Sequence, residues 1–412
     1  MSTLRQDADR IIRSALNAAL PDNAVGKALD EIKFGKGKIV LVAAGKAAWQ
    51  MAKAAWDAVG SRIAGGVVVT KYDHSKGEIG NLEIYEAGHP VSDDNSYMAT
   101  QKAIDCVSSL SAEDNVLFLL SGGGSALFEK PLISEAECQG ITKQLLKCGA
   151  NIVEMNTLRK RLSAVKGGRF AQLCSPAHVY AIVLSDIIGD PLDMIASGPA
   201  YPDSSTCEEA LEIASRYNLK LSDKAKELLK QETPKALDNV TTFVTGSVKQ
   251  LCKAASETAL SLGYKPVFLS SSLECEAREA GSMLASIALD HQDSSESLAY
   301  IAGGETVVHL TGHGLGGRNQ EIALSAADRI DRCSNTCVFS VGSDGTDGPT
   351  DAAGGYCDQD TKRILREQNV DIKAVLADND AYHALGKCNG LIFTGATGTN
   401  VNDLTVLLIR RR

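Results

Sequence analysis

The chain has 412 residues, a formal net charge of −9 and a pI near 5.4. Its length suggests roughly two to three domains. The acidic balance argues against nucleic acid or an anionic membrane surface as a partner, because such partners are bound by clustered Lys and Arg. The sequence has no Cys-x-x-Cys pair, no apolar run of about 18 residues and no basic-then-apolar leader. We therefore expect a cytoplasmic protein with reduced thiols that does not enter the membrane.

Short apolar runs alternate with segments of helical periodicity, which is typical of parallel α/β sheets covered by helices on both faces. We expect two α/β domains with mainly parallel, Rossmann-like sheets. A polar join at 230–239 predicts the boundary between domains 1–238 and 239–412, with the extreme C-terminus free to pack back on the first domain. The predicted strands are Ile39–Ala44, Val67–Thr70, Val116–Leu120, Val179–Leu184, Thr242–Thr245, Val267–Leu269, Leu298–Ala302, Cys337–Val341 and Leu391–Phe393.

Three predicted strands of the first half end in loops suited to anion chemistry, at the strand ends where open α/β sheets bind ligands. Lys46 follows the first of these strands and can reach an anion, although a lone lysine is more often solvated surface. Asp186 ends another strand, where a buried carboxylate is costly unless it is paired, metal-bound or hydrated. Between them, three glycines open a helix and can expose amides to a phosphate or carboxylate. The residues of this predicted cradle are Ser121, Gly122, Gly123, Gly124 and Ser125.

A basic segment at 156–169 lies between these loops. Leu158, Leu162 and Val165 share one face at helical spacing, and five cations occupy the rest. The cations form either a solvated face or an electrostatic collar around an anionic site, and the sequence leaves both interpretations open.

The second half contains a formal Gly-x-Gly-x-x-Gly at Gly312–Gly317, which favours a dinucleotide-binding loop and a dehydrogenase. Two details weaken that interpretation. The interval from Gly317 to Asp344 exceeds the usual separation of about 20 residues. Arg318 also stands at the predicted helix start, where a guanidinium is better suited to gripping a carboxylate or a phosphoryl group.

The segment Gly342–Gly355 sets three carboxylates among five glycines directly after an apolar run. Such a loop can hold a hard cation or take up a proton, although Gly, Asp and Pro are also ordinary turn residues. Asp344 is closest to the strand and is our candidate for chemistry; Asp347 is a candidate metal ligand, and Asp351 a structural cap. Combined with the basic residues above, these carboxylates suit phosphoryl transfer, which needs cations, Mg²⁺ and a positioned base.

Several motifs in order make the chain resemble class II glycerate kinase, the glycerate 2-kinase family with a C-terminal MOFRL domain. The resemblance extends from about Ala43 to Leu408. The motifs are Ala-Gly-Lys-Ala, Leu-Ser-Gly-Gly-Gly-Ser-Ala, Lys-Gly-Gly-Arg, Leu-Ser-Asp-x-x-Gly-Asp, Ala-Ser-Gly-Pro, Gly-Gly-Glu-Thr, Gly-Gly-Arg-Asn-Gln-Glu, Asp-Gly-Thr-Asp-Gly-Pro-Thr-Asp and Thr-Gly-Thr-Asn-Val.

This resemblance implies phosphorylation of D-glycerate at its 2-hydroxyl by ATP and Mg²⁺, in a cleft between two α/β domains. It implies a catalytic group of Lys46, Asp186 and Arg318, with Asp344 beside them. We expect Arg318 to bind the glycerate carboxylate or the transferred phosphoryl group, and Lys46 to neutralise charge at the same centre. One of the two aspartates accepts the hydroxyl proton, and the other helps to hold Mg²⁺. The additional predicted metal ligands are Asp190 and Asp347.

Two other functions stay open from the sequence. An NAD(P)-dependent hydroxypyruvate reductase is supported by Gly312–Gly317, and a non-catalytic glycerate or nucleotide sensor would bind its ligand without releasing ADP. The sequence also leaves open whether the protein is a homo-oligomer, which nucleotide it prefers, and how many small hydroxy acids it accepts.

Overall fold

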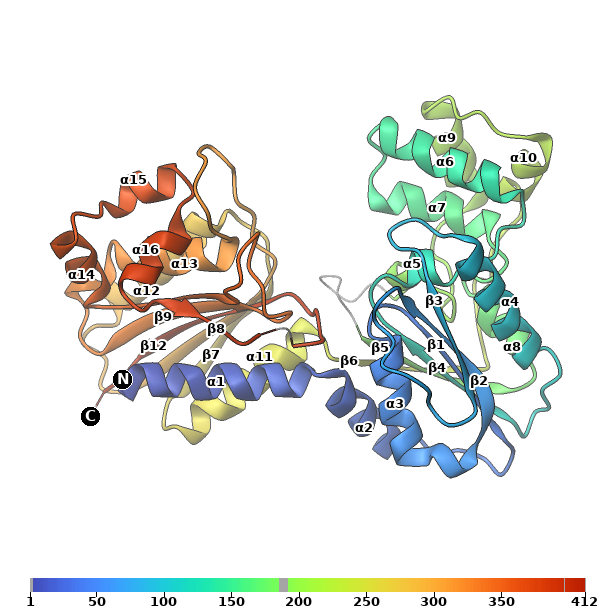
Figure 1. The fold of residues 1–412 in the computed structure, drawn as a ribbon, viewed down its shortest axis with the longest axis horizontal. Coiled ribbons are helices and arrows are strands. Elements are labelled where there is room, and N and C mark those ends of the chain that lie inside the picture. The colour runs from blue at the N-terminus through green and yellow to red at the C-terminus, as the bar shows by residue number, and fades with distance from the viewer. Residues whose placement is uncertain (1–2, 185–191, 396, 412) are drawn as a thin grey trace. The chain divides into compact units, whose positions relative to one another are not determined.

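The computed structural model describes residues 3–184, 192–395 and 397–411, and it divides them into two compact units (Figure 1). The parallel-sheet unit consists of residues 24–184 and 192–245. The mixed-sheet unit consists of the segment up to Asn23 and the residues from Gly246 onward. Asp186 and Asp190, both predicted site residues, lie outside the described residues.

The parallel-sheet unit contains six strands in the order β3-β2-β1-β4-β5-β6, all parallel. β1 and β4 are buried at every residue, which explains their continuous apolar sequence. The strands are β1 (Ile39–Ala44), β2 (Ile63–Lys71), β3 (Leu82–Ala87), β4 (Asn115–Leu120), β5 (His178–Leu184) and β6 (Val240–Thr245).

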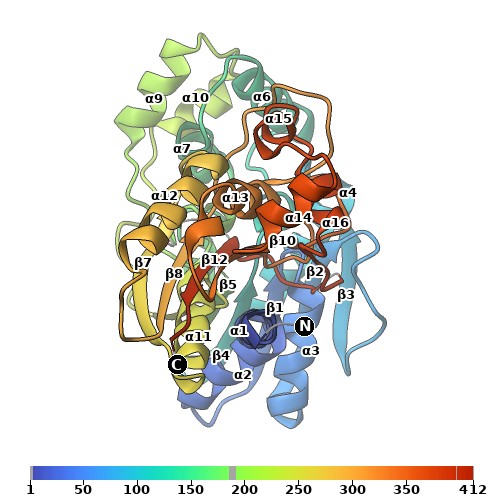
Figure 2. The same ribbon diagram turned by 90° about the vertical axis from the view of Figure 1, so that its left-hand side faces the viewer.

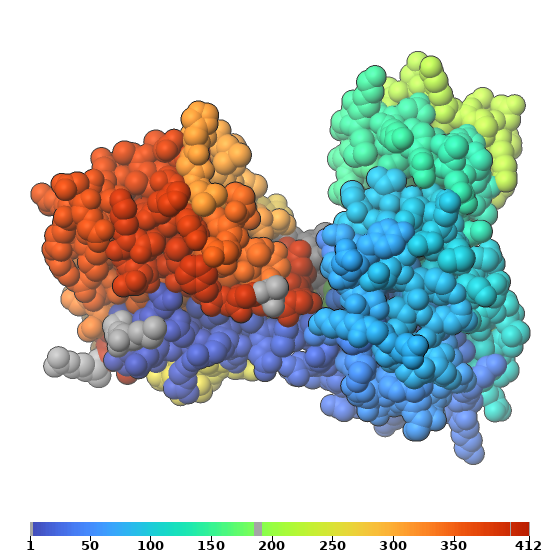
Figure 3. Space-filling model, viewed as in Figure 1, coloured from blue at the N-terminus to red at the C-terminus, as the bar shows by residue number. Residues whose placement is uncertain are grey.

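Helices cover both faces of this sheet. In β4, Leu117 and Leu119 pack with α2 and α3, while Phe118 points to the opposite face and contacts Phe128 and Phe170 at ring-centroid distances of 5.6 and 4.8 Å. Four further helices, α6, α7, α9 and α10, form their own apolar cluster. Their residues, green to yellow-green in Figure 3, make up one end of the unit. The helices are α2 (Pro21–Glu31), α3 (Ala48–Val59), α4 (Asp94–Val107), α5 (Gly124–Leu127), α6 (Glu135–Lys147), α7 (Ile152–Leu162), α8 (Arg169–Cys174), α9 (Cys207–Arg216) and α10 (Asp223–Leu229).

The mixed-sheet unit also contains six strands, in the order β11-β10-β9-β12-β8-β7. β7, β8, β9 and β11 run in one direction, and β10 and β12 run against them. The strands are β7 (Lys265–Leu273), β8 (Leu298–Gly304), β9 (Thr336–Gly342), β10 (Gly354–Asp358), β11 (Leu391–Ile392) and β12 (Asp403–Ile409).

Two apolar clusters hold helices against the two faces of the mixed sheet (Figure 2). α1 and α11 lie on one face, and α12, α13 and α16 lie on the other. The helices of this unit are α1 (Thr3–Ala19), α11 (Val248–Ser261), α12 (Ala277–Asp290), α13 (Arg318–Ala327), α14 (Thr361–Glu367), α15 (Ile372–Ala377) and α16 (Ala381–Lys387). No helix in the described part of the chain has the length and apolarity that a membrane span requires.

The prediction of two α/β units with helix-covered sheets is confirmed, and every predicted strand is present. The units divide the chain differently from 1–238 and 239–412, because β6 pairs with β5 in the first sheet and α1 packs on the second. β12, near the C-terminus, lies between β8 and β9 in the second sheet. The predicted strands did not include β3, β10 or β12.

Candidate active site

Lys46 lies where β1 ends, in a loop that is fixed by the neighbouring strands. Its amide donates to the carbonyl of Gly122 at 2.9 Å, and the amide of Gly45 donates to Val69 at 3.1 Å. Gly45 has a φ of +129°, and a Cβ there would lie 2.2 Å from Oγ of Ser121. Glycine is therefore required at this position, and the exposed Lys46 side chain starts from an anchored backbone.

The predicted cradle at Ser121–Ser125 lies directly against the Lys46 loop. Ser121 is buried, and its hydroxyl accepts the amide of Ala47 at 3.1 Å. Among the described residues, no acceptor pairs with the amides of Gly122 and Gly123. Two free N–H groups beside an exposed lysine are the donors that a phosphate group needs, so the geometry supports the predicted cradle.

Arg318 is the first residue of α13, and carboxylates hold its side chain. Nε and Nη2 donate to the two oxygens of Asp403 at 2.5 and 3.1 Å, and Nη1 donates to Glu305 at 3.0 Å. β12 pairs Asp403 with Gly304 of β8 and Gly342 of β9, so one edge of the mixed sheet carries all these residues. Burial disfavours the charged guanidinium, but the hydrogen bonds and charge of Asp403 outweigh it and raise the pKa of Arg318. The guanidinium therefore stays charged in a fixed orientation.

Asp347 occupies the amino end of α13. One carboxylate oxygen accepts the amide of Asn319 at 3.1 Å, and the other accepts the amide of Gln320 at 2.9 Å. A Cβ at Gly317 would lie 2.3 to 2.5 Å from this carboxylate, so only glycine permits the contact. Burial raises the pKa of Asp347 to about 7, against the opposing effect of these amides. The carboxylate thus caps the helix with both oxygens. It fits poorly as a metal ligand because both oxygens already accept amides. The metal role of Asp347 stays a prediction.

Asp344 and Asp351 have different surroundings from Asp347. Asp344 is half-buried two residues beyond β9, and its Oδ1 accepts the amide of Thr346 at 2.9 Å. Its Oδ2 has no hydrogen-bond partner in the described part of the chain, which suits a ligand for Mg²⁺ or a proton acceptor. Asp351 is exposed and accepts the hydroxyl of Tyr382 at 2.6 Å.

The first four amides of the Gly312–Gly317 loop already have acceptors within the protein. Side chains of the 378–380 turn accept the amides of Gly312, His313 and Leu315 at 2.9 to 3.0 Å. A Cβ at Gly312 or Gly314 would lie 2.3 to 2.4 Å from atoms of that turn. These glycines permit close packing of two loops. This packing explains the Gly-x-Gly-x-x-Gly motif, which was the main support for a reductase.

Three cations of the basic segment at 156–169 fit neither interpretation: they do not form a solvated face, and they do not form a collar around an anion. Lys160, Arg161 and Lys166 are fully buried. Lys160 pairs with Asp203 at 2.9 Å, Arg161 with Glu232 at 3.2 Å, and Lys166 with Glu129 at 3.0 Å. These cations are compensated by carboxylates inside the fold, and the helical pattern could not show it because those carboxylates are distant in sequence.

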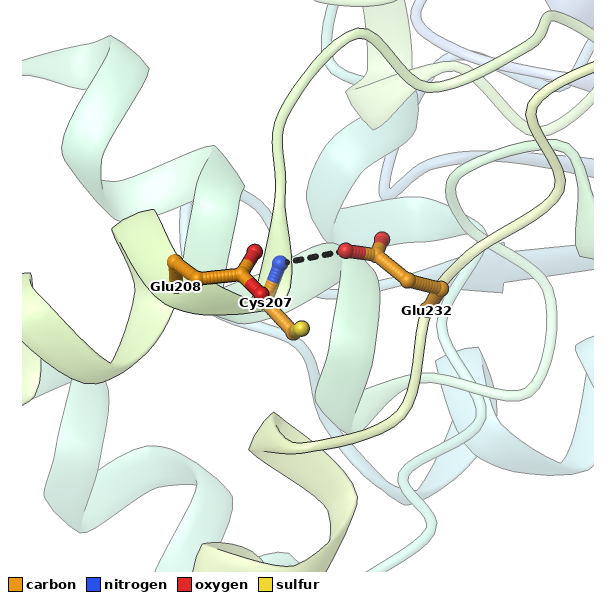
Figure 4. Close-up of side chains that lie close together, drawn as sticks. All are labelled: Cys207, Glu208 and Glu232. Carbon is orange, nitrogen blue, oxygen red and sulfur yellow. Dashed lines mark hydrogen bonds between the residues drawn. The ribbon is translucent and has the colours of Figure 1, made fainter.

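Within the described residues, one group has the spacing of metal ligands: Cys207, Glu208 and Glu232, with ligand atoms within 4.8 Å of one another (Figure 4). Glu232 already accepts the amide of Cys207 at 2.7 Å and pairs with Arg161 and Lys235. Two cations thus neutralise it, and we assign no metal to this group. It includes none of the predicted metal ligands.

The structure places the predicted residues in two groups. Lys46 and the glycine cradle are together in the parallel-sheet unit, and Arg318, Asp344 and Asp347 are together in the mixed-sheet unit. Asp403 and Glu305, the partners of Arg318, were not among the predicted site residues, although Glu305 stands in the Gly-Gly-Glu-Thr motif.

The two helix-covered sheets define a two-unit α/β protein, with Lys46 after a strand of the first sheet and Arg318 at the start of a helix on the second. A model described as domain of unknown function DUF4147 matches residues 7–230, and the MOFRL family model matches residues 298–403. A D-glycerate 2-kinase from Thermotoga maritima is 50% identical over 99% of both chains. The crystal structure of a glycerate kinase from that organism matches with a TM-score of 0.94 and 50% identity, covering 99% of this chain and 100% of the other. A putative hydroxypyruvate reductase from Agrobacterium vitis is 38% identical over 98% of this chain and 94% of its own.

The chain belongs to the glycerate kinase family that carries the MOFRL domain, as its motifs indicated.

Proposed function

We propose that this protein is an ATP-dependent glycerate 2-kinase, which transfers the γ-phosphate of ATP to the 2-hydroxyl of D-glycerate and forms 2-phosphoglycerate. The observation that carries the proposal is the 50% identity to a D-glycerate 2-kinase over 99% of both chains. The free amides and exposed lysine at the end of β1 and β4 support it, because phosphoryl transfer depends on positioned cations and N–H donors.

Each group of residues has a distinct part in this proposal. Lys46 and the amides of Gly122 and Gly123 bind phosphate oxygens in the parallel-sheet unit. Arg318, oriented by Asp403, binds the glycerate carboxylate or the transferred phosphoryl group. In this proposal the two groups act on the same pair of substrates, ATP and D-glycerate.

Mg²⁺, when bound with ATP, would shield the charge of the β- and γ-phosphates. Asp344 fits it better than Asp347, because Asp344 keeps an oxygen free while Asp347 has both oxygens on amides. Asp186 keeps its proposed role as the base or as a metal ligand, and Asp190 keeps its proposed role as a metal ligand. Either Asp186 or Asp344 accepts the hydroxyl proton as the oxygen attacks phosphorus.

A coupled assay with ATP, Mg²⁺ and D-glycerate tests the proposal. We expect ADP release, and a product that enolase converts directly, since enolase uses 2-phosphoglycerate and not 3-phosphoglycerate. ADP release with a product that enolase ignores would overturn the 2-position, and no D-glycerate-dependent ADP release would overturn the kinase.

The name of the Agrobacterium relative makes a hydroxypyruvate reductase the second candidate. NADH and hydroxypyruvate mixed with the protein distinguish the two, because a kinase leaves the absorbance of NADH unchanged. The packed Gly312–Gly317 loop favours that outcome. We also propose a cytoplasmic location, where ATP is abundant, and a homo-oligomer remains compatible with the proposal.

A further inference from the structure

His89 and Lys46 meet at one point of the glycine cradle. A Cβ at Gly123 would lie 3.2 Å from Nε2 of His89 and 3.2 Å from Cγ of Lys46. His89 follows β3, Lys46 follows β1, and Gly123 follows β4, so the carboxyl ends of three parallel strands bring them together. The mechanism proposed above does not use His89.

The charges around His89 are positive. The pKa of His89 is lowered, chiefly because its ring is partly buried and further because of the nearby charges of Lys46, Lys71 and His74. Lys71 is the last residue of β2, at the same sheet edge. His74 accompanies them, with Nδ1 placed 3.0 Å from the carbonyl of Lys46, to which it donates since a carbonyl can only accept.

Carboxylates do not neutralise this group in the described part of the chain. Neither Lys46 nor Lys71 has an ion pair there, and His89 has no hydrogen bond there. The nearby acids have other partners: Asp93 accepts the hydroxyl of Tyr72 at 2.7 Å and the amide of Ser96 at 3.0 Å. Other cations of this unit do have carboxylate partners: Lys53 pairs with Asp57, Lys160 with Asp203, and Lys166 with Glu129. An unneutralised positive cluster beside free amides is the arrangement of an anion site.

We propose that Lys71 and His89 extend the site around Lys46 and bind phosphate oxygens of ATP together with the amides of Gly122 and Gly123. This inference rests on the proposed kinase function. A polyphosphate is the better match than glycerate, because it carries several negative charges and glycerate carries one. Phosphate oxygens accept hydrogen bonds, so His89 donates through a ring N–H and Lys71 through its ammonium group.

The test compares Lys71→Met and His89→Gln with two matched controls from the opposite sheet edge. Lys36→Met removes an exposed cation just before β1, and His178→Gln replaces the histidine that begins β5. Calorimetry measures the Kd of the β,γ-imido analogue of ATP with Mg²⁺, of tripolyphosphate, and of D-glycerate. Thermal unfolding confirms that every variant is folded.

We expect Lys71→Met and His89→Gln each to weaken binding of the ATP analogue and of tripolyphosphate about tenfold or more. D-glycerate binding should change by less than about twofold, which is within the spread expected for a site that loses no contact. The controls should match the wild-type protein in all three titrations.

Two results would overturn the inference: unchanged polyphosphate binding in both variants, or a loss confined to D-glycerate, which would assign the cluster to the carboxylate. The failure of the parent proposal looks different. A wild-type protein without kinase activity that still binds tripolyphosphate through Lys71 and His89 would refute the kinase and retain the anion site.

Discussion

Two groups of cations in the parallel-sheet unit have opposite surroundings. Lys160, Arg161 and Lys166 are fully buried and paired with carboxylates. Lys46 is exposed at a strand end and has no ion pair in the described part of the chain. A buried charge must be compensated within the fold, whereas a charge that is left uncompensated at a strand end is free to bind a ligand. Substitutions in the first group should therefore affect stability, and substitutions in the second should affect activity.

The largest effect is expected from Asp203→Asn, which breaks the buried group. Asp203 accepts Nζ of Lys160 at 2.9 Å and the hydroxyl of Thr233 at 2.7 Å. The substitution removes a carboxylate from two buried cations, because Asp203 also lies 3.7 Å from Arg161, and it leaves Lys160 with Asp193, at 3.2 Å, as its remaining ionic partner. The free energy of unfolding should fall by up to about 3–5 kcal/mol. Urea unfolding measures it. Asp57→Asn, which breaks the exposed pair with Lys53, should leave the midpoint nearly unchanged.

Lys46→Met should separate activity from stability. In the role proposed for Lys46, its charge stabilises the transferring phosphoryl group, and its removal should lower kcat about 10²- to 10³-fold. The free energy of unfolding should stay within about 0.5 kcal/mol of the wild-type value, as for other exposed sites. A variant that keeps its activity but unfolds more easily would reverse the comparison and make Lys46 a structural residue.

Arg318 lies between the two groups of cations, because it is paired with carboxylates and yet 33% of its side chain is exposed. Arg318→Lys keeps the charge but cannot reproduce the two bonds to Asp403 and the third to Glu305. We expect kcat/KM to fall about 10- to 100-fold, together with a lower unfolding midpoint. Arg329→Lys, at the other end of α13, is the control and should retain full activity. Equal activity in both variants would show that the guanidinium geometry is not needed.

The smallest effect is expected at Asp351, the exposed member of the Gly342–Gly355 loop. Its hydrogen bond with Tyr382 raises the pKa of that phenol, since ionised Asp351 disfavours a second negative charge. In Asp351→Asn the phenol should titrate at a lower pH, which ultraviolet absorbance of tyrosinate detects. The kinase rate should change by less than about twofold, as for a residue that touches no reacting group. A large loss of rate would move Asp351 into the reaction centre.

Short-range patterns predicted much of the fold and part of the site. The fully buried strands β1 and β4 are continuous apolar runs, and the glycine cradle follows one of them as expected. Strand direction in the second sheet was not predictable, because the reversed β12 depends on pairing with β8 and β9 far away in sequence. β3 was missed because its middle residues are only half-buried or exposed, and its apolar signal is weak.

The sequence also did not reveal which residues pair with the buried and site cations. Asp203 lies 43 residues from Lys160, and Asp403 lies 85 residues from Arg318, so local patterns contain neither pair. The same limit produced the misleading dinucleotide motif: the acceptor for the amide of His313 is Asp378, 65 residues further on. In each case the residue type was visible in the sequence, but the group that determines its role comes from a distant segment.

The discontinuous mixed-sheet unit has a consequence for synthesis on the ribosome. α1 buries Leu4, Ile11 and Ile12 in a cluster with residues of α11 and the mixed sheet, all of which follow Gly246 in the chain. At about 5–20 residues per second, the roughly 220 residues that separate them take roughly 10–45 s to emerge. During that time the parallel-sheet unit can fold, while the apolar face of α1 stays exposed because its packing partners have not yet been synthesised.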